Sequence, residues 1–118
     1  YFRLGSEVFI NITNDSWSKT KSAELQHFAV ASFRAIEMRT TLVRSTNSGY
    51  STVVNPAGKI LYDMPLFTAD SLYAEVPVYK RDMTPYALLG NWIPLLCGVF
   101  LFASFIVSVF LKFKEDHE

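Results

Sequence analysis

The side chains best suited to chemistry form one run, Thr13-Asn14-Asp15-Ser16-Trp17, directly after a segment that alternates like a β-strand. Carboxylate, amide and hydroxyl groups bind polar ligands, and an indole can wall an apolar pocket. Because ligand sites gather where strands end in loops, Asn14, Asp15 and Trp17 are candidate pocket residues. Composition alone favours the alternative, in which Asn14 or Asp15 makes an Asx turn and Trp17 packs in the core.

A complete catalytic constellation is missing from the sequence. It has no Gly-x-Ser-x-Gly elbow, no Gly-rich phosphate loop and no His-Glu-x-x-His helix, and His27 and His117 lie far apart in sequence. The single cysteine, Cys97, lies in an apolar run where a thiolate is disfavoured, so we interpret it as a small lipid- or helix-facing residue and not as a nucleophile. We expect no metal site, no cofactor and no catalytic residue in this chain.

Length and composition limit the possible classes. The 118 residues fit one ordinary domain, and 11 Lys+Arg against 11 Asp+Glu give no net charge, which excludes the basic footprint of a general nucleic-acid binder. Half of the residues are hydrophobic and 15% are aromatic, so the chain is not of the disordered class. The chain begins at Tyr1 without an initiator Met, and we expect it to be a fragment.

Charge divides the chain into two parts. Seventeen charged residues lie within 1–82, none lies within 83–111, and five lie within 112–118. The twenty uncharged residues 92–111 span about 30 Å as a helix, which predicts a transmembrane helix; a buried helix of a soluble protein is the alternative. Residues 83–91 are then a juxtamembrane linker and 112–118 a charged tail. Two basic residues flank each side of the helix, so charge leaves its orientation undecided.

Within residues 1–82 the periodicity predicts strands around one helix. Alternation predicts a strand over 7–13 that is covered on both faces, and Ser22 is a plausible N-cap for a helix that ends near Arg39. The predicted apolar stripe of that helix consists of Leu25, Phe28, Ala29, Ser32 and Ile36. Further strands are predicted over 41–46 and 50–54, over 60–62 as the partner of 53–54 in a hairpin turning at 55–58, and over 72–79 as an edge strand.

Three blocks of the sequence carry a resemblance to a known family. They are "NITNDSW" (11–17), "QHFAVASFRAIEMRTTLVRSTNSGYSTVVNPAGKIL" (26–61) and "MTPYALLGNW" (83–92), followed by the hydrophobic segment. In this order they resemble the C-terminal part of bacterial apolipoprotein N-acyltransferases, which belong to the nitrilase (carbon-nitrogen hydrolase) superfamily. Soluble nitrilase-like amidases share part of the pattern and lack the membrane helix.

The resemblance implies an α+β fold, a four-layer αββα nitrilase-like sandwich whose C-terminal part is residues 1–82, followed by one transmembrane helix. It implies a domain on the periplasmic side of the inner (cytoplasmic) membrane and a cytoplasmic tail. It also implies a Glu-Lys-Cys triad that lies upstream of this chain, so Lys19, Glu24, Glu37 and Cys97 take none of its roles. Asn14, Asp15 and Trp17 would lie beside the pocket, while Arg34 and Glu37 would hold the helix in place.

The implied reaction moves a fatty acyl chain from a phospholipid, through a Cys thioester, to the N-terminal amine of a diacylglyceryl-cysteine lipoprotein. By the same resemblance this chain alone is inactive. It departs from the family's usual pattern at Ser18, Leu88 and Asn91. Two alternatives remain open: a non-catalytic, single-pass membrane-anchored interaction domain, and a membrane-tethered nitrilase-type amidase. A Cys-Tyr-Glu stretch and several hydrophobic segments encoded upstream would distinguish the acyltransferase from both.

Overall fold

The computed structural model of the chain describes residues 4–80 and 82–115, with side chains as far as Phe113. It forms two compact units, Tyr1–Leu88 and Leu89–Glu118, each of which is considered by itself. The residues outside this description are 1–3, Arg81 and 116–118. They include His117 and the ends of the predicted segments 1–82 and 112–118.

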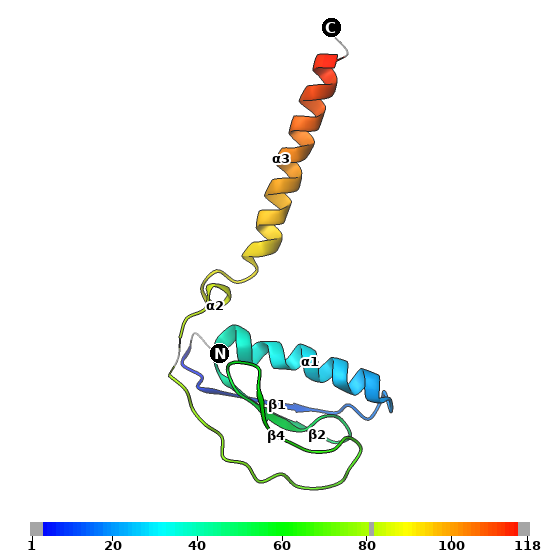
Figure 1. The fold of residues 1–118 in the computed structure, drawn as a ribbon, viewed down its shortest axis with the longest axis vertical. Coiled ribbons are helices and arrows are strands. Elements are labelled where there is room, and N and C mark those ends of the chain that lie inside the picture. The colour runs from blue at the N-terminus through cyan, green and yellow to red at the C-terminus, as the bar shows by residue number, and fades with distance from the viewer. Residues whose placement is uncertain (1–3, 81, 116–118) are drawn as a thin grey trace. The chain divides into compact units, whose positions relative to one another are not determined.

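A four-stranded mixed sheet forms the centre of the first unit. Its strands are β1 (Val8–Thr13), β2 (Thr41–Thr46), β3 (Thr52–Val54) and β4 (Ile60–Asp63), in the order β1-β2-β3-β4. β1 and β2 are parallel and joined through a helix, whereas β2, β3 and β4 form an antiparallel meander (Figure 1). The strand predictions for 7–13, 41–46, 50–54 and 60–62 are confirmed to within two residues at either end.

The hairpin predicted from Asn55-Pro56-Ala57-Gly58 is also confirmed. The Gly58 N–H donates to the carbonyl of Asn55 at 2.9 Å, and the Asn55 side chain accepts from the N–H groups of Ala57 and Lys59. Gly58 has a φ of 79°, a conformation that glycine adopts without the steric cost of a Cβ. The turn is therefore specified by residues that lie next to one another in sequence.

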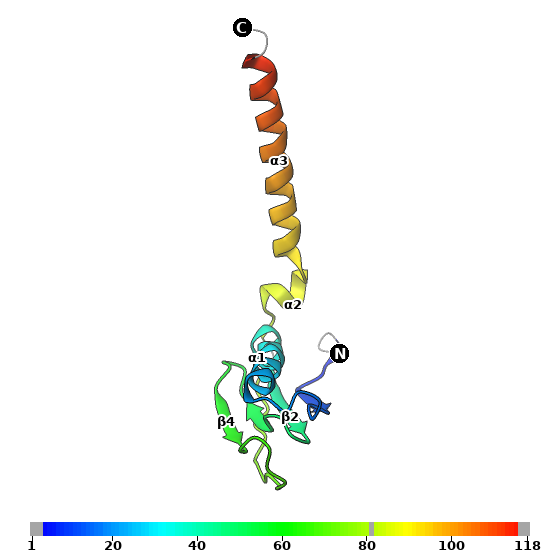
Figure 2. The ribbon, with the colours of Figure 1, turned by 90° about the vertical axis from the view of Figure 1, so that its right-hand side faces the viewer.

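The helix α1 (Lys21–Met38) covers one face of the sheet, as Figures 1 and 2 show from two sides. The core between them consists of buried Ala35, Leu42 and Val54, with Phe9, Phe28 and Ala31 packed against it. The predicted N-cap at Ser22 is wrong, because the N-cap is Thr20, two residues earlier, and the helix begins at Lys21. The helix ends at Met38, and its C-cap, Arg39, has a left-handed φ of 50°.

The predicted apolar stripe of α1 is rotated by about one residue from the face that is buried. Glu24 and Ala35 are its buried residues, while Leu25 is 39% exposed and Ala29 is exposed. The burial of Glu24 near the start of the helix cannot be predicted from a pattern of apolar residues. Its burial follows from the polar network described below, which draws this side of α1 toward the sheet.

The edge strand predicted over 72–79 is wrong. Residues 69–80 form no strand, and the segment crosses the side of the sheet away from α1 (Figure 1). It is tied there by the Thr41 hydroxyl, which donates to the carbonyl of Pro77 at 2.5 Å. Alternation of apolar residues predicts a strand only where a neighbouring strand can complete the ladder, and Pro77 has no N–H to offer.

The expectation that the first strand is covered on both faces is also wrong within the described chain. β1 is at the edge of the sheet, and Ile10 and Ile12 on the face away from α1 are 71% and 80% exposed. In the described sheet, α1 therefore covers one face, whereas the Ile10 and Ile12 side chains of β1 are uncovered on the opposite face.

The end of α1 is linked to the short helix α2 (Pro85–Leu89). Arg34 donates to Glu37 at 2.8 Å and to the Tyr86 hydroxyl at 3.3 Å, and the Thr84 hydroxyl donates to the carbonyl of Glu37. The Tyr86 hydroxyl and the Glu37 carboxylate hold the pKa of Arg34 above its ordinary value. Arg34 and Glu37 therefore link the end of α1 to α2 and to Thr84 just before it.

The second unit contains the helix α3 (Trp92–Glu115). Within this helix, the 22 residues Trp92–Phe113 have a mean hydropathy of 2.5, and the most apolar part of this stretch is not buried. At 1.5 Å per residue this stretch is about 33 Å long, enough to cross a bilayer core. Cys97 lies exposed within it. Length and composition thus fit a transmembrane helix.

Candidate functional site

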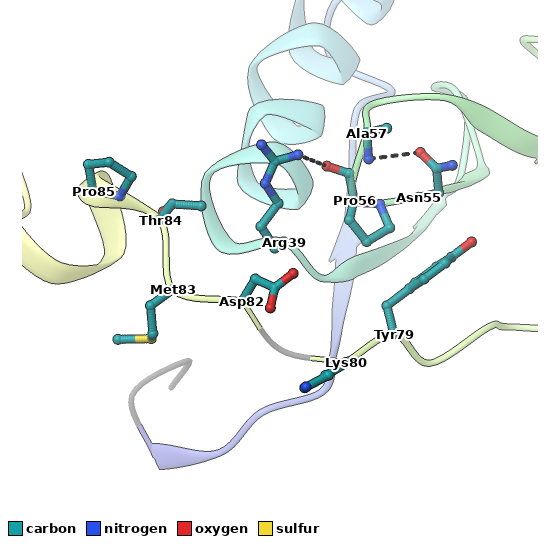
Figure 3. A pocket seen from close by; sticks show the side chains of 10 residues that line it. All are labelled: Arg39, Asn55, Pro56, Ala57, Tyr79, Lys80, Asp82, Met83, Thr84 and Pro85. Atoms are coloured by element: carbon teal, nitrogen blue, oxygen red, sulfur yellow. Dashed lines mark hydrogen bonds between the residues drawn. The ribbon is translucent and has the colours of Figure 1, made fainter.

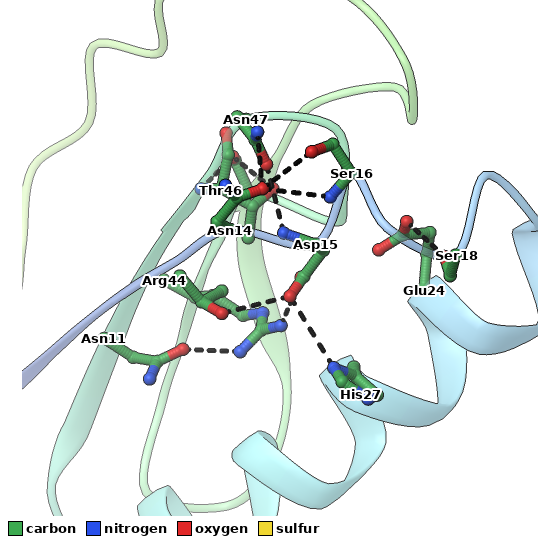
Figure 4. A network of polar contacts seen from close by, with 12 residues as sticks. Asn11, Asn14, Asp15, Ser16, Ser18, Glu24, His27, Arg44, Thr46 and Asn47 are labelled. Atoms are coloured by element: carbon green, nitrogen blue, oxygen red, sulfur yellow. Dashed lines mark hydrogen bonds and ion pairs between the residues drawn. The ribbon is translucent and has the colours of Figure 1, made fainter.

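The parallel pairing of β1 and β2 brings their carboxyl ends together. Thr13 lies opposite Thr46, so the loop that follows β1 meets the turn that follows β2. Across this meeting point the Asn47 side chain donates to the Asn14 side chain at 2.8 Å and accepts from the Asp15 N–H at 3.0 Å (Figure 4). The two loops are therefore bound to each other by side chains.

A buried ion pair lies beneath these loops. The Arg44 guanidinium donates to the Asp15 carboxylate at 2.7 Å, and the two side chains are 4% and 2% exposed. The second nitrogen of the same guanidinium donates to the Asn11 side chain, and the Thr13 hydroxyl donates to Asp15 at 3.0 Å. A buried charge is tolerated only when it is paired and hydrogen-bonded, so removing either partner would leave the other uncompensated.

Glu24 places a second carboxylate beside Asp15. One of its oxygens accepts from the Ser18 hydroxyl at 2.7 Å, and the residue is 1% exposed. Gly49 separates the two acids: a Cβ at this position would lie 2.4 Å from an Asp15 oxygen and 2.7 Å from a Glu24 oxygen. The turn can pass here only because residue 49 has no side chain.

Trp17 and His27 form the exposed side of the cluster. The indole is 66% exposed, and its ring centroid lies 5.2 Å from that of His27 with the planes tilted by 56°. His27 Nδ1 lies 3.6 Å from the Asp15 carboxylate, and its side chain is 45% exposed. A large aromatic side chain is thus presented to solvent above a buried polar network.

The three residues predicted from the sequence therefore lie together and differ in exposure. Asn14 makes the predicted Asx turn, because its side chain accepts from the N–H and hydroxyl of Ser16 at 3.2 and 2.7 Å. Asp15 is buried and holds the loop. The alternative in which Trp17 packs in the core is wrong for the described chain.

The sequence analysis did not identify Arg44, Asn47, Gly49, His27 or Glu24 as members of the cluster. One signal was available for Arg44. It alternates with Leu42 on β2 and so lies on the core face of its strand, where a charged side chain requires a buried partner. The partner itself, 29 residues away, could not be identified from spacing.

A hollow of about 670 Å³ lies elsewhere in the described chain (Figure 3). None of Asn14, Asp15 and Trp17 lines it. It is formed where the end of α1 and the β3–β4 turn meet the segment before α2, by Arg39, Asn55, Pro56, Ala57, Tyr79, Lys80, Asp82, Met83, Thr84 and Pro85. Arg39 donates to the carbonyl of Pro56 across one side of it, at 3.4 Å.

Comparison with known proteins gives consistent results. The chain is 65% identical over 108 residues to apolipoprotein N-acyltransferase 2 of Treponema denticola, covering 92% of this chain and 20% of that protein. It is 58% identical over 100 residues to apolipoprotein N-acyltransferase 2 of Treponema pallidum, covering 85% and 18%. Against the apolipoprotein N-acyltransferase of Borreliella burgdorferi it is 37% identical over 117 residues, covering 98% and 22%.

The chain thus spans about a fifth of the length of these relatives. The pattern of the carbon-nitrogen hydrolase family matches residues 1–86, which include the whole sheet, α1 and the polar cluster at the strand ends. By this match the chain belongs to the carbon-nitrogen hydrolase family.

Proposed function

We propose that the chain is the C-terminal part of a membrane-bound apolipoprotein N-acyltransferase. The complete enzyme moves a fatty acyl chain from a phospholipid to the N-terminal amine of a diacylglyceryl-cysteine lipoprotein. The identity to the acyltransferases of Treponema supports this assignment. The observation in the fold that carries it is an indole exposed on a loop that hydrogen bonds fix on both sides, because such a surface can wall an acyl chain.

The chemistry divides the transfer into two steps. A Cys thiolate attacks the ester carbonyl of the phospholipid and forms a thioester, while the lysophospholipid oxygen leaves and takes a proton. The lipoprotein amine then attacks the thioester carbonyl, loses a proton and releases the thiolate. A carboxylate base activates the thiol and a Lys stabilises the tetrahedral oxyanion. These three groups belong to the part of the enzyme that precedes this chain.

This chain supplies the wall and its support. In the proposal, Trp17 contacts the acyl chain, and Asn14 and Asp15 hold the loop that carries it. Asp15 does so through Arg44, and Asn14 through Asn47. Since the supporting bonds connect the loop after β1 to β2 and to the turn that follows β2, the wall is attached to the sheet.

The membrane keeps the site near its lipid-bound substrates. In the proposal α3 crosses the inner (cytoplasmic) membrane, the carbon-nitrogen hydrolase part is periplasmic and the tail 112–118 is cytoplasmic. The sheet and α1 are then the C-terminal part, about the last third, of a four-layer αββα sandwich whose remainder comes from upstream. The exposed Ile10 and Ile12 of β1 support this arrangement, since sheet packing would bury them.

Substitution of Trp17 in the complete enzyme tests the proposal. Trp17→Ala should lower transfer from a phospholipid with an alkyne-tagged acyl chain to a diacylated lipopeptide about tenfold, with the amount of folded protein unchanged. Tyr73→Ala is the matched control, because Tyr73 is an aromatic residue that is 93% exposed and far from the cluster in sequence. Equal losses of activity and of folded protein would contradict a wall role for Trp17. Hydrolysis of amides without acyl transfer would favour the amidase.

A further inference from the structure

We infer that His27 is the positioning residue for Trp17, and that through this contact the buried Asp15–Arg44 pair sets which acyl-chain lengths the enzyme accepts. The inference rests on the proposed function and deepens it: it concerns substrate selectivity at the same site. His27 has no part in the two acyl-transfer steps.

The backbone on either side of Trp17 is fixed by hydrogen bonds. On one side the Ser16 N–H and hydroxyl donate to the Asn14 side chain. On the other side the Ser18 N–H donates to the carbonyl of Asp15 at 3.3 Å and its hydroxyl donates to Glu24. The Cα of Trp17 therefore has a defined position, and the indole can vary only by rotation about its two side-chain torsions.

Within the described chain, the ring contact with His27 is the one aromatic contact that the indole makes. A side chain that is 66% exposed has little packing to choose between its rotamers. The imidazole at 5.2 Å supplies a surface on one side of the indole and so favours the rotamers that keep this contact. The direction in which the wall faces thus depends on His27.

His27 is in turn held from beneath. It lies on α1, and its Nδ1 is 3.6 Å from a carboxylate oxygen of Asp15. That carboxylate is fixed by Arg44 and by the Thr13 hydroxyl. The contacts form one path from the sheet to solvent, Arg44 to Asp15 to His27 to Trp17, and Figure 4 shows its buried part.

A wall at a fixed place discriminates among acyl chains by length. An acyl chain that just reaches the wall buries its last methylenes against it. A shorter acyl chain leaves part of the wall solvated, and a longer one clashes with the wall. One methylene in an apolar pocket changes kcat/KM by roughly 10-fold or more. An indole free to rotate loses this discrimination, because it can move away from a long chain or close over a short one.

The test compares His27→Ala and His27→Phe in the complete enzyme. The measured quantity is the ratio of kcat/KM for the preferred phospholipid donor to that for a donor whose acyl chains are four carbons shorter. His27→Ala should reduce this ratio by about tenfold or more, whereas His27→Phe, which keeps a ring beside the indole, should keep most of it. Gln26→Ala, an exposed neighbour on α1, is the matched control and should leave the ratio unchanged.

A double-mutant cycle separates positioning from general damage. In a Trp17→Ala background His27→Ala should have no further effect on the ratio, because there is no indole left to position. Equal loss of kcat/KM for both donors in His27→Ala, or an unchanged effect in the Trp17→Ala background, would overturn the inference. Failure of the proposed function is a different result, namely no acyl transfer by the unmodified enzyme from either donor.

Discussion

Gly49 allows the turn after β2 to pack closely against Asp15 and Glu24 because it has no side chain. Asp15 cannot move to admit a Cβ, because Arg44, Thr13 and the Asn47 contact fix it. Gly49→Ala should therefore force the turn away from β1 and cost about 1–3 kcal/mol of stability, the range for overpacking a filled site. Gly98→Ala, where nothing lies within 4 Å, is the control. Chemical denaturation of the complete enzyme measures the difference, and equal stabilities of the two variants would show that the turn is free to yield.

Tyr50 connects the same turn to β4. Its hydroxyl donates to the Asp63 carboxylate, and this bond, with burial and the nearby charge, raises the pKa of Tyr50 to about 12. Because the folded state keeps a proton that the unfolded chain loses near pH 10, the bond stabilises the fold fully below pH 10. This contribution is lost as the pH rises through about 12.

Ultraviolet titration of tyrosinate should detect this proton. The difference between the unmodified protein and Tyr50→Phe should show one tyrosine that ionises near pH 12, and Asp63→Ala should move that transition toward 10.0, the ordinary pKa of tyrosine. A Tyr50 transition that stays in place in Asp63→Ala would mean that the carboxylate does not hold the phenol proton.

Among the elements, those specified by adjacent residues could be predicted from the sequence. The β3–β4 hairpin follows from Asn55, Pro56 and Gly58, and β2 from a segment in which three of the six residues are β-branched, because each preference acts within a few residues. The segment 72–79 has an equally regular alternation and forms no strand, since a strand also needs a partner that local sequence does not reveal.

The candidate site divides in the same way. Asn14 and its Asx turn are local and were predictable, and so was a loop at the end of the first strand. The contacts that hold this loop join residues 29 to 33 positions apart, and they exist only because the parallel pairing places Thr13 beside Thr46. Arg44 and Glu24 were missed because their burial is set by this tertiary arrangement, which overrides the apolar periodicity of α1.

The helix α3 carries a prediction about orientation. If it crosses the inner membrane with the carbon-nitrogen hydrolase part in the periplasm, an epitope tag placed after Glu118 is shielded in intact spheroplasts. External protease should then leave the tag in place and remove it only after the membrane is permeabilised. Immunoblotting for the tag gives the result, and its loss from intact spheroplasts would reverse the proposed topology.

As a whole molecule, residues 1–118 expressed alone should have no acyltransferase activity. The single thiol, Cys97, lies in the apolar helix, and residues 92–111 contain no carboxylate or lysine that could act beside it. Membranes that contain only this chain should form no hydroxylamine-sensitive acyl adduct with phospholipid. In the complete enzyme Cys97→Ser should keep near-normal activity. An adduct on Cys97, or an inactive Cys97→Ser enzyme, would return this thiol to consideration as the nucleophile.

The parallel pairing of β1 with β2 also determines how late in synthesis β1 can pair with β2. Asp15 leaves the ribosome 29 residues before Arg44, which at 5–20 residues per second is about 1.5–6 s. The antiparallel meander closes over short turns, whereas β1 must wait for a crossover of 27 residues to bring it back to β2. During those seconds β1 has not yet paired with β2, and a strand edge left without its partner favours aggregation. The ion pair between Asp15 and Arg44 forms only after β2 has been made and therefore marks the end of that interval.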